Sequence, residues 1–133
     1  MSKSNATEND IVKFIFNAVA MPAYGSNLQV NLHTADPGEA GTATTSAPTY
    51  TGYAAVAVAR DAGGWTVASN QASNTAEVTF PECTGGSDTL THASVSVVGS
   101  GQILYSGALT ASLAISNLIT PRFPAGTLVM QED

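Results

Sequence analysis

The first apolar run, within residues 7–21, has the spacing of one helical face. Ile11, Phe14 and Ile15 lie three or four positions apart, which places their side chains on one side of a helix. Thr7 is a suitable N-cap, and the proline and glycine that follow the run are typical helix-ending residues. We therefore expect one amphipathic helix that begins at Thr7 and carries Phe14 and Ile15 on its buried stripe.

After this segment the period changes to two. Leu28, Val30 and Leu32 alternate with polar residues, His33 among them, as in a strand with one buried face. Similar runs follow between turn residues: YTGYAAVAVAR, WTVAS, TAEVTF, LTHASVSVV, QILYSGALT, SLAIS and TPRFPAGTLVM. About eight short strands without intervening helices predict an all-β protein, an antiparallel β-sandwich.

The length of 133 residues fits one domain. We expect an N-terminal arm and helix over residues 1–26 and the sandwich over 27–133. Residues 34–52, TADPGEAGTATTSAPTYTG, have no apolar periodicity, and unstructured loops of this length are uncommon inside compact domains. We interpret this segment as a functional loop or as one that a partner stabilises. The predicted partner-binding residues come from this loop and the helix: Phe14, Ile15, Asp36, Pro37, Thr44, Thr45 and Tyr50.

The charge content changes the picture of the surface. Charged residues form 11% of the chain, against about 25% in an average domain, so much of the exterior is neutral and suited to contact with other protein. The net charge is −6, and the four cations, Lys3, Lys13, Arg60 and Arg122, are scattered. Binding to nucleic acid needs clustered cations and is not expected.

The apolar run IVKFIFNAVAM contains Lys13 and Asn17. It is too short to span a bilayer and has the wrong flanks for a secretory signal. We therefore expect a soluble protein that is made in the cytoplasm and makes no membrane contact.

Candidate chemistry is sparse. His33, Asp36 and Glu39 surround an Asp-Pro-Gly sequence, which is explained by a turn but could also hold a cation or a catalytic group. His92 either faces a polar surface or marks a bulge, and Cys83 has no neighbouring base in the sequence to activate it. With no phosphate-binding loop and no G-x-S-x-G motif, we expect no enzyme activity, no metal and no cofactor.

The aromatic residues allow a second interpretation. Trp65, Tyr50, Tyr53 and Tyr105 could form a platform on which a sugar ring stacks. Trp65, however, alternates with Val67 in a short predicted strand, which is more typical of a core position. We favour the core for these residues and keep glycan binding as the alternative.

Several stretches resemble a family of small virion structural proteins of tailed bacteriophages. They are LQVNLHTADPGEAGT, YTGYAAVAVAR, WTVASN, NTAEVTFPECTGGSDTLTHASV, ILYSGALT and FPAGTLVMQED, in this order from Leu28 to the C-terminus. Within that family the chain is most similar to the capsid cement proteins typified by that of a Bordetella bacteriophage.

The resemblance implies a jelly-roll protein on the outer surface of the capsid. Its partners would be the major capsid protein of HK97-like fold and a second copy of itself, because such proteins form dimeric clamps between neighbouring capsid subunits. Two alternatives remain: a tail or fibre component that binds host-surface glycans, and an enzyme that acts on envelope polymers through His33 and Asp36.

Overall fold

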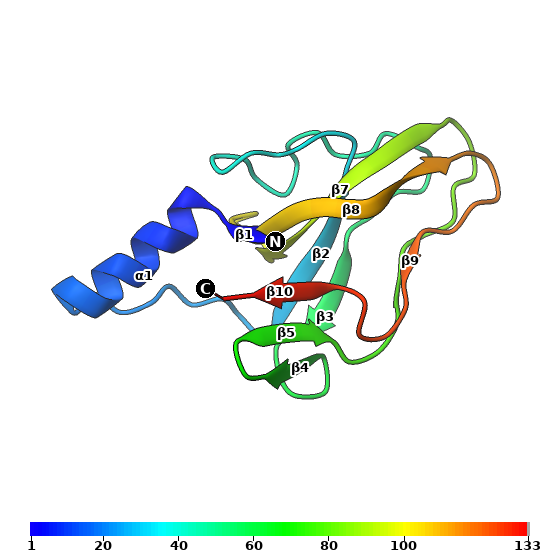
Figure 1. Cartoon of the computed structure of the whole chain (residues 1–133). Helices are drawn as coiled ribbons and strands as arrows, with labels where there is room; N and C mark the ends of the chain where they lie inside the picture. The colour runs from blue at the N-terminus through cyan, green and yellow to red at the C-terminus, as the bar shows by residue number, and fades with distance from the viewer. Residues whose placement is uncertain (133) are drawn as a thin grey trace.

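The computed structural model describes residues 1–132, so the last residue of the predicted sandwich, Asp133, lies outside the described part (Figure 1). The chain forms one helix and a series of strands. In order these are β1 (Ser2–Lys3), α1 (Asn5–Asn17), β2 (Asn27–His33), β3 (Val56–Ala59), β4 (Trp65–Ala68), β5 (Gln71–Asn74), β6 (Val78–Thr79), β7 (Asp88–Val97), β8 (Ile103–Ile115), β9 (Arg122–Phe123) and β10 (Val129–Gln131).

The strands form three antiparallel sheets. A five-stranded sheet has the order β1-β8-β7-β2-β3, a three-stranded sheet has the order β10-β5-β4, and β6 pairs with β9. The predicted all-β fold with a single N-terminal helix is confirmed for the described residues. There are more strands than the eight expected, because the alternation of apolar residues does not reveal very short or polar strands such as β1 and β5.

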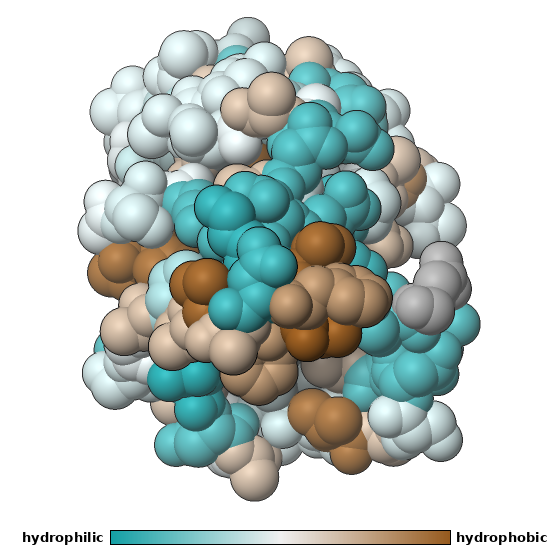
Figure 2. Space-filling view, turned by 90° about the vertical axis from the view of Figure 1, so that its left-hand side faces the viewer, coloured by the Kyte–Doolittle hydropathy of each residue, from teal (hydrophilic) through white to brown (hydrophobic). Residues whose placement is uncertain are grey.

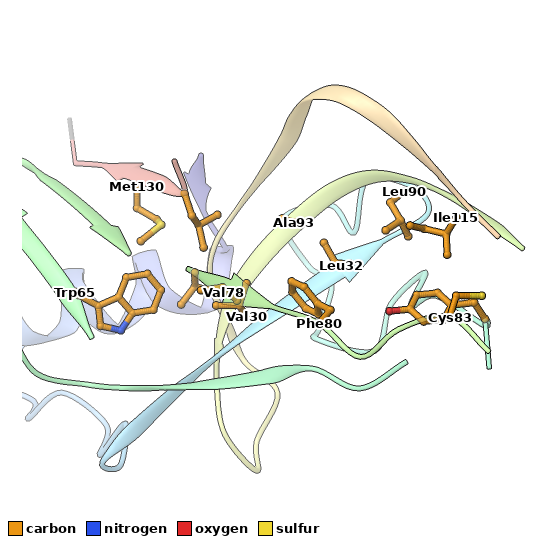
Figure 3. Close-up of a cluster of buried hydrophobic side chains, with 13 residues drawn as sticks. Val30, Leu32, Trp65, Val78, Phe80, Cys83, Leu90, Ala93, Ile115 and Met130 are labelled. Carbon is orange, nitrogen blue, oxygen red and sulfur yellow. The ribbon is translucent and has the colours of Figure 1, made fainter. Parts of the chain in front are cut away.

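The core lies between the five-stranded sheet and the two smaller ones. Val30 and Leu32 of β2 point into it from one side, and Trp65 of β4 and Met130 of β10 close it from the other (Figure 3). Trp65 is only 7% exposed, which confirms the prediction that its ring is a core residue.

The opposite face of β2 and β7 is polar, and the loop of residues 34–52 folds back onto it. The Thr34 amide donates to the Ser46 carbonyl at 2.8 Å. The Asp88 carboxylate accepts from the amides of Thr49 and Tyr50, both at 2.7 Å. The loop is therefore held by the protein's own sheet in the single chain, and whether it also serves a function or contacts a partner stays a prediction.

The bounds of the helix also differ from the expectation. Ser4, and not Thr7, is the N-cap, and its hydroxyl accepts from the Thr7 amide at 3.3 Å. The helix ends well before Pro22, since Ala18 adopts a left-handed conformation with φ of 54° and the Val19 amide donates to the Lys13 carbonyl at 3.2 Å. Hydrogen bonding of the last turn therefore ends the helix without a proline or glycine.

Candidate interaction surfaces

The first turns of α1 are fixed to the start of β8. The Thr7 hydroxyl donates to the Ile103 carbonyl at 2.9 Å, and the Ser4 hydroxyl donates to the same oxygen. The side-chain amide of Gln102 donates to the Asp10 carboxylate at 3.0 Å. These neutral and charge-assisted hydrogen bonds therefore fix the direction in which the helix leaves the sheets.

The second half of α1 projects away from the sheets, and the chain after it runs back toward β2 (Figure 1). Their apolar side chains are exposed, and Figure 2 shows apolar groups on the face toward which the helix points. The exposed fractions are 53% for Val12, 54% for Phe14, 61% for Ile15, 78% for Phe16 and 49% for Val19. We call these five residues the α1 apolar surface. The sequence left open whether the stripe that contains Phe14 and Ile15 packs on its own sandwich or on a neighbour. In the single chain it does not pack on the sandwich, which does not extend beneath these two residues.

The α1 apolar surface is unusual in its arrangement. At about 100° per residue, Val12, Ile15 and Phe16 fall on one arc of the helix, whereas Lys13 and Asn17 fall on the opposite side, and Val19 follows the end of the helix. Burying a Val, Ile or Phe side chain completely is worth about 1.5–3 kcal/mol. With about half of each side chain still exposed, a partner that covered all five would gain of the order of 5 kcal/mol.

The loop residues proposed as contacts fall into two groups. Asp36 and Thr44 are exposed and Thr45 is half-buried, whereas Pro37 and Tyr50 are buried. The Asp36 carboxylate accepts from the Gly38 amide at 2.8 Å, and Gly38 has φ of 71°, so the turn interpretation of Asp-Pro-Gly is confirmed. Tyr50 donates its hydroxyl to the Pro81 carbonyl at 3.0 Å and offers no ring surface to a partner in this conformation.

The loop and the helix meet at one place. The Asn5 amide donates to the Glu39 carbonyl at 3.0 Å, and the first residues of α1 line a shallow depression together with residues 39–42. Of the predicted contact residues, however, only Phe14 and Ile15 belong to a continuous apolar surface. Sequence periodicity identified these two but did not single out Phe16, the most exposed member.

A buried polar cluster lies under the loop, formed by Asn31, His33, Ser94 and Ser96, each at most 1% exposed. His33 Nδ1 lies 2.7 Å from the Thr45 carbonyl oxygen, and its Nε2 lies 2.8 Å from the Ser94 hydroxyl. Because a carbonyl only accepts, Nδ1 carries the proton and Nε2 accepts from Ser94. The Asn31 side-chain amide donates to both serine hydroxyls, at 3.1 and 2.9 Å.

This cluster resembles a serine–histidine pair but lacks access. Ser94 and His33 are 0% exposed, so a substrate has no path to the hydroxyl in this conformation. Both His33 ring nitrogens are occupied by Thr45 and Ser94, and neither bonds to Asp36. The arrangement supports a structural role in which the histidine joins the loop to the sheet. That the protein is not an enzyme stays a prediction.

His92 lies opposite His33 on the neighbouring strand. A register shift between Leu90 and His92 interrupts the pairing of β7 with β8, which confirms the bulge that the sequence offered as one alternative.

Within residues 1–132 no group of three or more His, Cys, Asp or Glu side chains is arranged to hold a metal ion. No helix in the same range is long and apolar enough to cross a membrane.

The aromatic residues considered for glycan binding are buried or half-buried. Tyr50 is 3% exposed and Trp65 is 7% exposed, while Tyr53 and Tyr105 are half-buried. The Tyr53 hydroxyl accepts from the Leu32 amide at 3.0 Å, and the Tyr105 hydroxyl bonds to Glu132. These four rings pack within the protein, the three tyrosine hydroxyls are hydrogen-bonded there, and the rings form no flat exposed platform.

Comparison with known proteins extends these observations. No curated protein matches the chain. The model of a protein family described as podophage GP4 fiber I protein gp80 matches residues 2–131. Because this match covers nearly the whole sequence, the chain belongs to the podophage GP4 fiber I protein gp80 family and is a structural protein of the bacteriophage virion.

Proposed function

We propose that this virion protein decorates and cements the capsid by bridging neighbouring major capsid subunits of HK97-like fold, as a homodimer on the outer surface of the shell. The sequence resemblance to cement proteins supports the site of action. The observation that carries the proposal is the α1 apolar surface, which leaves five large apolar side chains bare on a rigidly directed helix.

Adhesion of this kind needs no chemistry at the site. A molecule that binds the assembled shell and not its separate subunits stabilises the shell by mass action. An amphipathic helix that enters a hydrophobic groove is a common way to achieve such binding. The scattered cations of the chain are consistent with a position away from the packaged DNA, and nucleic acid is not among the proposed partners.

The position in the particle tests the proposal. Purified virions separated into heads and tails should contain the protein in the head fraction, in a copy number that approaches that of the major capsid protein. A few copies per particle, confined to the tail fraction, would contradict cementing.

The role of α1 is tested by Phe16→Ser, with Lys13→Ser on the polar side of the same helix as the matched control. Because Phe16 is 78% exposed, the substitution should change the free energy of unfolding by less than about 0.5 kcal/mol. Binding of the purified protein to capsids that lack it should weaken about tenfold, as expected for the loss of about 1.4 kcal/mol of apolar contact. Equal binding of both variants and the wild type would remove α1 from the interface.

A second candidate is a fibre component, which the printed description of the matched family favours. Glycan binding by ring stacking gains no support from the four aromatic residues, since all are buried or half-buried. A fibre component would be recovered with the fibres after mild dissociation of the particle, whereas a cement protein would stay with the shell.

A further inference from the structure

Strand β8 has a long edge that no other strand covers. On one side it pairs with β7, but on the other side only Tyr105 and Ser106 have partners, Lys3 and Ser2 of β1. From Gly107 onward the outer edge of β8 has no strand partner within the described chain. Residues 107–115, GALTASLAI, contain no charge and no proline, which are two of the features that protect exposed edges in natural sheets.

The middle of this edge arches away from the sheet. Ala108 pairs with His92 and Leu113 pairs with Leu90, so residues 109–112 lie opposite the single residue Thr91. Figure 3 shows the orange ribbon of β8 rising away from the yellow-green ribbon of β7. We call residues 109–112 the β8 arch. Its backbone is unpaired toward β7 as well as on its outer edge.

A cavity of about 510 Å³ lies beneath the β8 arch. Its walls are more apolar than polar and come from both layers, with Leu109 and Leu113 on β8 and Phe123 and Val129 on the opposite side. Among the described residues, Arg122 is the only one that contributes a charged side chain to the lining. Its guanidinium group lies 3.7 Å from the Glu77 carboxylate. The cavity is therefore suited to large uncharged side chains.

The N-terminus shows how an extended segment uses this edge. β1 adds to β8 in antiparallel orientation, and Met1, the residue before it, lines the same cavity. Met1 packs so closely on Gly107 that a Cβ at that position would lie 2.8 Å from the Met1 Cγ. A strand on the edge and an apolar side chain in the cavity thus already occur together at one end of the site.

We propose that the β8 arch and the cavity beneath it bind an extended, uncharged segment of a neighbouring virion protein. The segment adds to the outer edge of β8 beyond β1 and inserts a large apolar side chain into the cavity, as in other cases of strand addition, where the main chain supplies affinity and pockets supply specificity. This inference rests on the proposed attachment to the particle and names a second contact beside α1.

The size of the side chains argues against a second copy of the β8 arch as the occupant. Two arches paired around a two-fold axis would present mainly Ala, Thr and Ser side chains to each other. These are too small to fill either cavity, so both would remain open. A segment of another protein with Leu, Met or Phe at the inserted position would hydrogen-bond to the β8 edge and place a large side chain in the cavity at the same time.

Amide hydrogen exchange of the free protein and of the protein in intact particles tests the inference. The amides of the β8 arch should exchange at least tenfold more slowly in the particle. A photoreactive benzoylphenylalanine at Thr110, incorporated into particles, should cross-link to one segment of a different virion protein. Unchanged exchange, a cross-link to a second copy of this chain, or no cross-link at all would each overturn the inference.

A pair of variants separates this site from a general loss of structure. Ala111→Lys places a charge on the β8 arch, and Val67→Lys places the same charge on the edge strand β4, where Val67 is 73% exposed. Both should melt like the wild type, but only Ala111→Lys should lose about tenfold or more in particle binding. If α1 is protected in particles while the β8 arch exchanges freely and both variants bind equally, this inference fails and the proposed attachment through α1 stands.

Discussion

Acidification from pH 7 to pH 5 should destabilise the protein through His33. The side chain is 0% exposed and joins the loop carbonyl of Thr45 to the Ser94 hydroxyl. Burial lowers the pKa of His33 below its ordinary value, although the hydrogen bond that the ring donates to the Thr45 carbonyl acts in the opposite direction. Of the nearby charges, His92 lowers this pKa further and Asp36 raises it. The neutral ring is therefore the form that the fold requires.

Proton binding at His33 sets the direction and the largest possible size of the change in unfolding free energy with pH. The folded protein binds fewer protons at His33 than the unfolded chain does, so stability is fully present above about pH 6.5 and falls as the pH decreases. One group changes the free energy of unfolding by at most about 1.4 kcal/mol per pH unit, which limits the loss between pH 7 and pH 5 to about 2 kcal/mol.

The physical cause lies in the buried polar cluster. A protonated ring would direct a second N–H at the Ser94 hydroxyl, which already accepts from Asn31 at 3.1 Å. The Ser94 proton would then lose the acceptor it has in the neutral state. Among residues 1–132 no carboxylate is hydrogen-bonded to this ring, so the buried charge would also lack a direct counter-ion.

Urea unfolding at pH 7, 6 and 5 measures this loss. The His33→Gln variant should lose most of the pH dependence in this range, whereas His92→Gln should keep it. The lower limit of pH 5 leaves Glu132 ionised, because hydrogen bonds from Lys3 and Tyr105 lower its pKa. Identical pH dependence in the wild type and His33→Gln would refute the reasoning.

Two further predictions concern the stability of the sandwich. Phe80, 1% exposed between the rings of Tyr53 and Phe123, should cost about 3–5 kcal/mol of unfolding free energy when changed to Ala, measured in urea. Asn74→Ala should cost about 2–4 kcal/mol in the same assay, because its side chain is 1% exposed and bonds to the Pro124 carbonyl at 3.0 Å and the Leu128 amide at 2.9 Å, which would lose their partner. A loss below 1 kcal/mol in either variant would contradict the packing and hydrogen bonding described above.

The alternation of apolar residues predicted the central strands because both sides of those strands face a defined environment. Val30 and Leu32 enter the core, while Asn31 and His33 enter the buried polar cluster. From the sequence the polar side of β2 would be expected to face solvent, since nothing in the order of residues shows that a distant loop covers it. The loop reaches that face only because contacts such as Thr49 with Asp88 form across 39 positions of the chain.

Other elements were missed because their signals are weak or distributed. β5 has the polar sequence QASN and forms because it lies between β4 and β10. β8 is one strand where the sequence pattern predicts two, because the β8 arch interrupts the alternation of its apolar residues. Both strands form through pairing with strands that are distant in the sequence, and the pattern of one sequence does not show which strands pair.

Helix α1 shows a different limit of sequence reasoning. The spacing of Phe14 and Ile15 correctly predicts a helix with an apolar side, but the same pattern arises whether the helix covers its own domain or another protein. Structure resolves this, because the first turn is tied to Ile103 and the apolar half lies beyond the sandwich. The exposed position of that half was therefore not available from periodicity.

The separation between the core and α1 has a consequence for the proposed attachment to the particle. The core is built from the sheets and excludes the α1 apolar surface, so we expect substitutions at Phe16 or Val12 to weaken the proposed adhesion with little effect on folding. On this proposal, affinity for the particle can change one side chain at a time, while the sandwich keeps its stability. If substitutions at Phe16 instead unfolded the free protein, the helix would have to belong to the folding unit, and the division between a stable body and an adhesive arm would not hold.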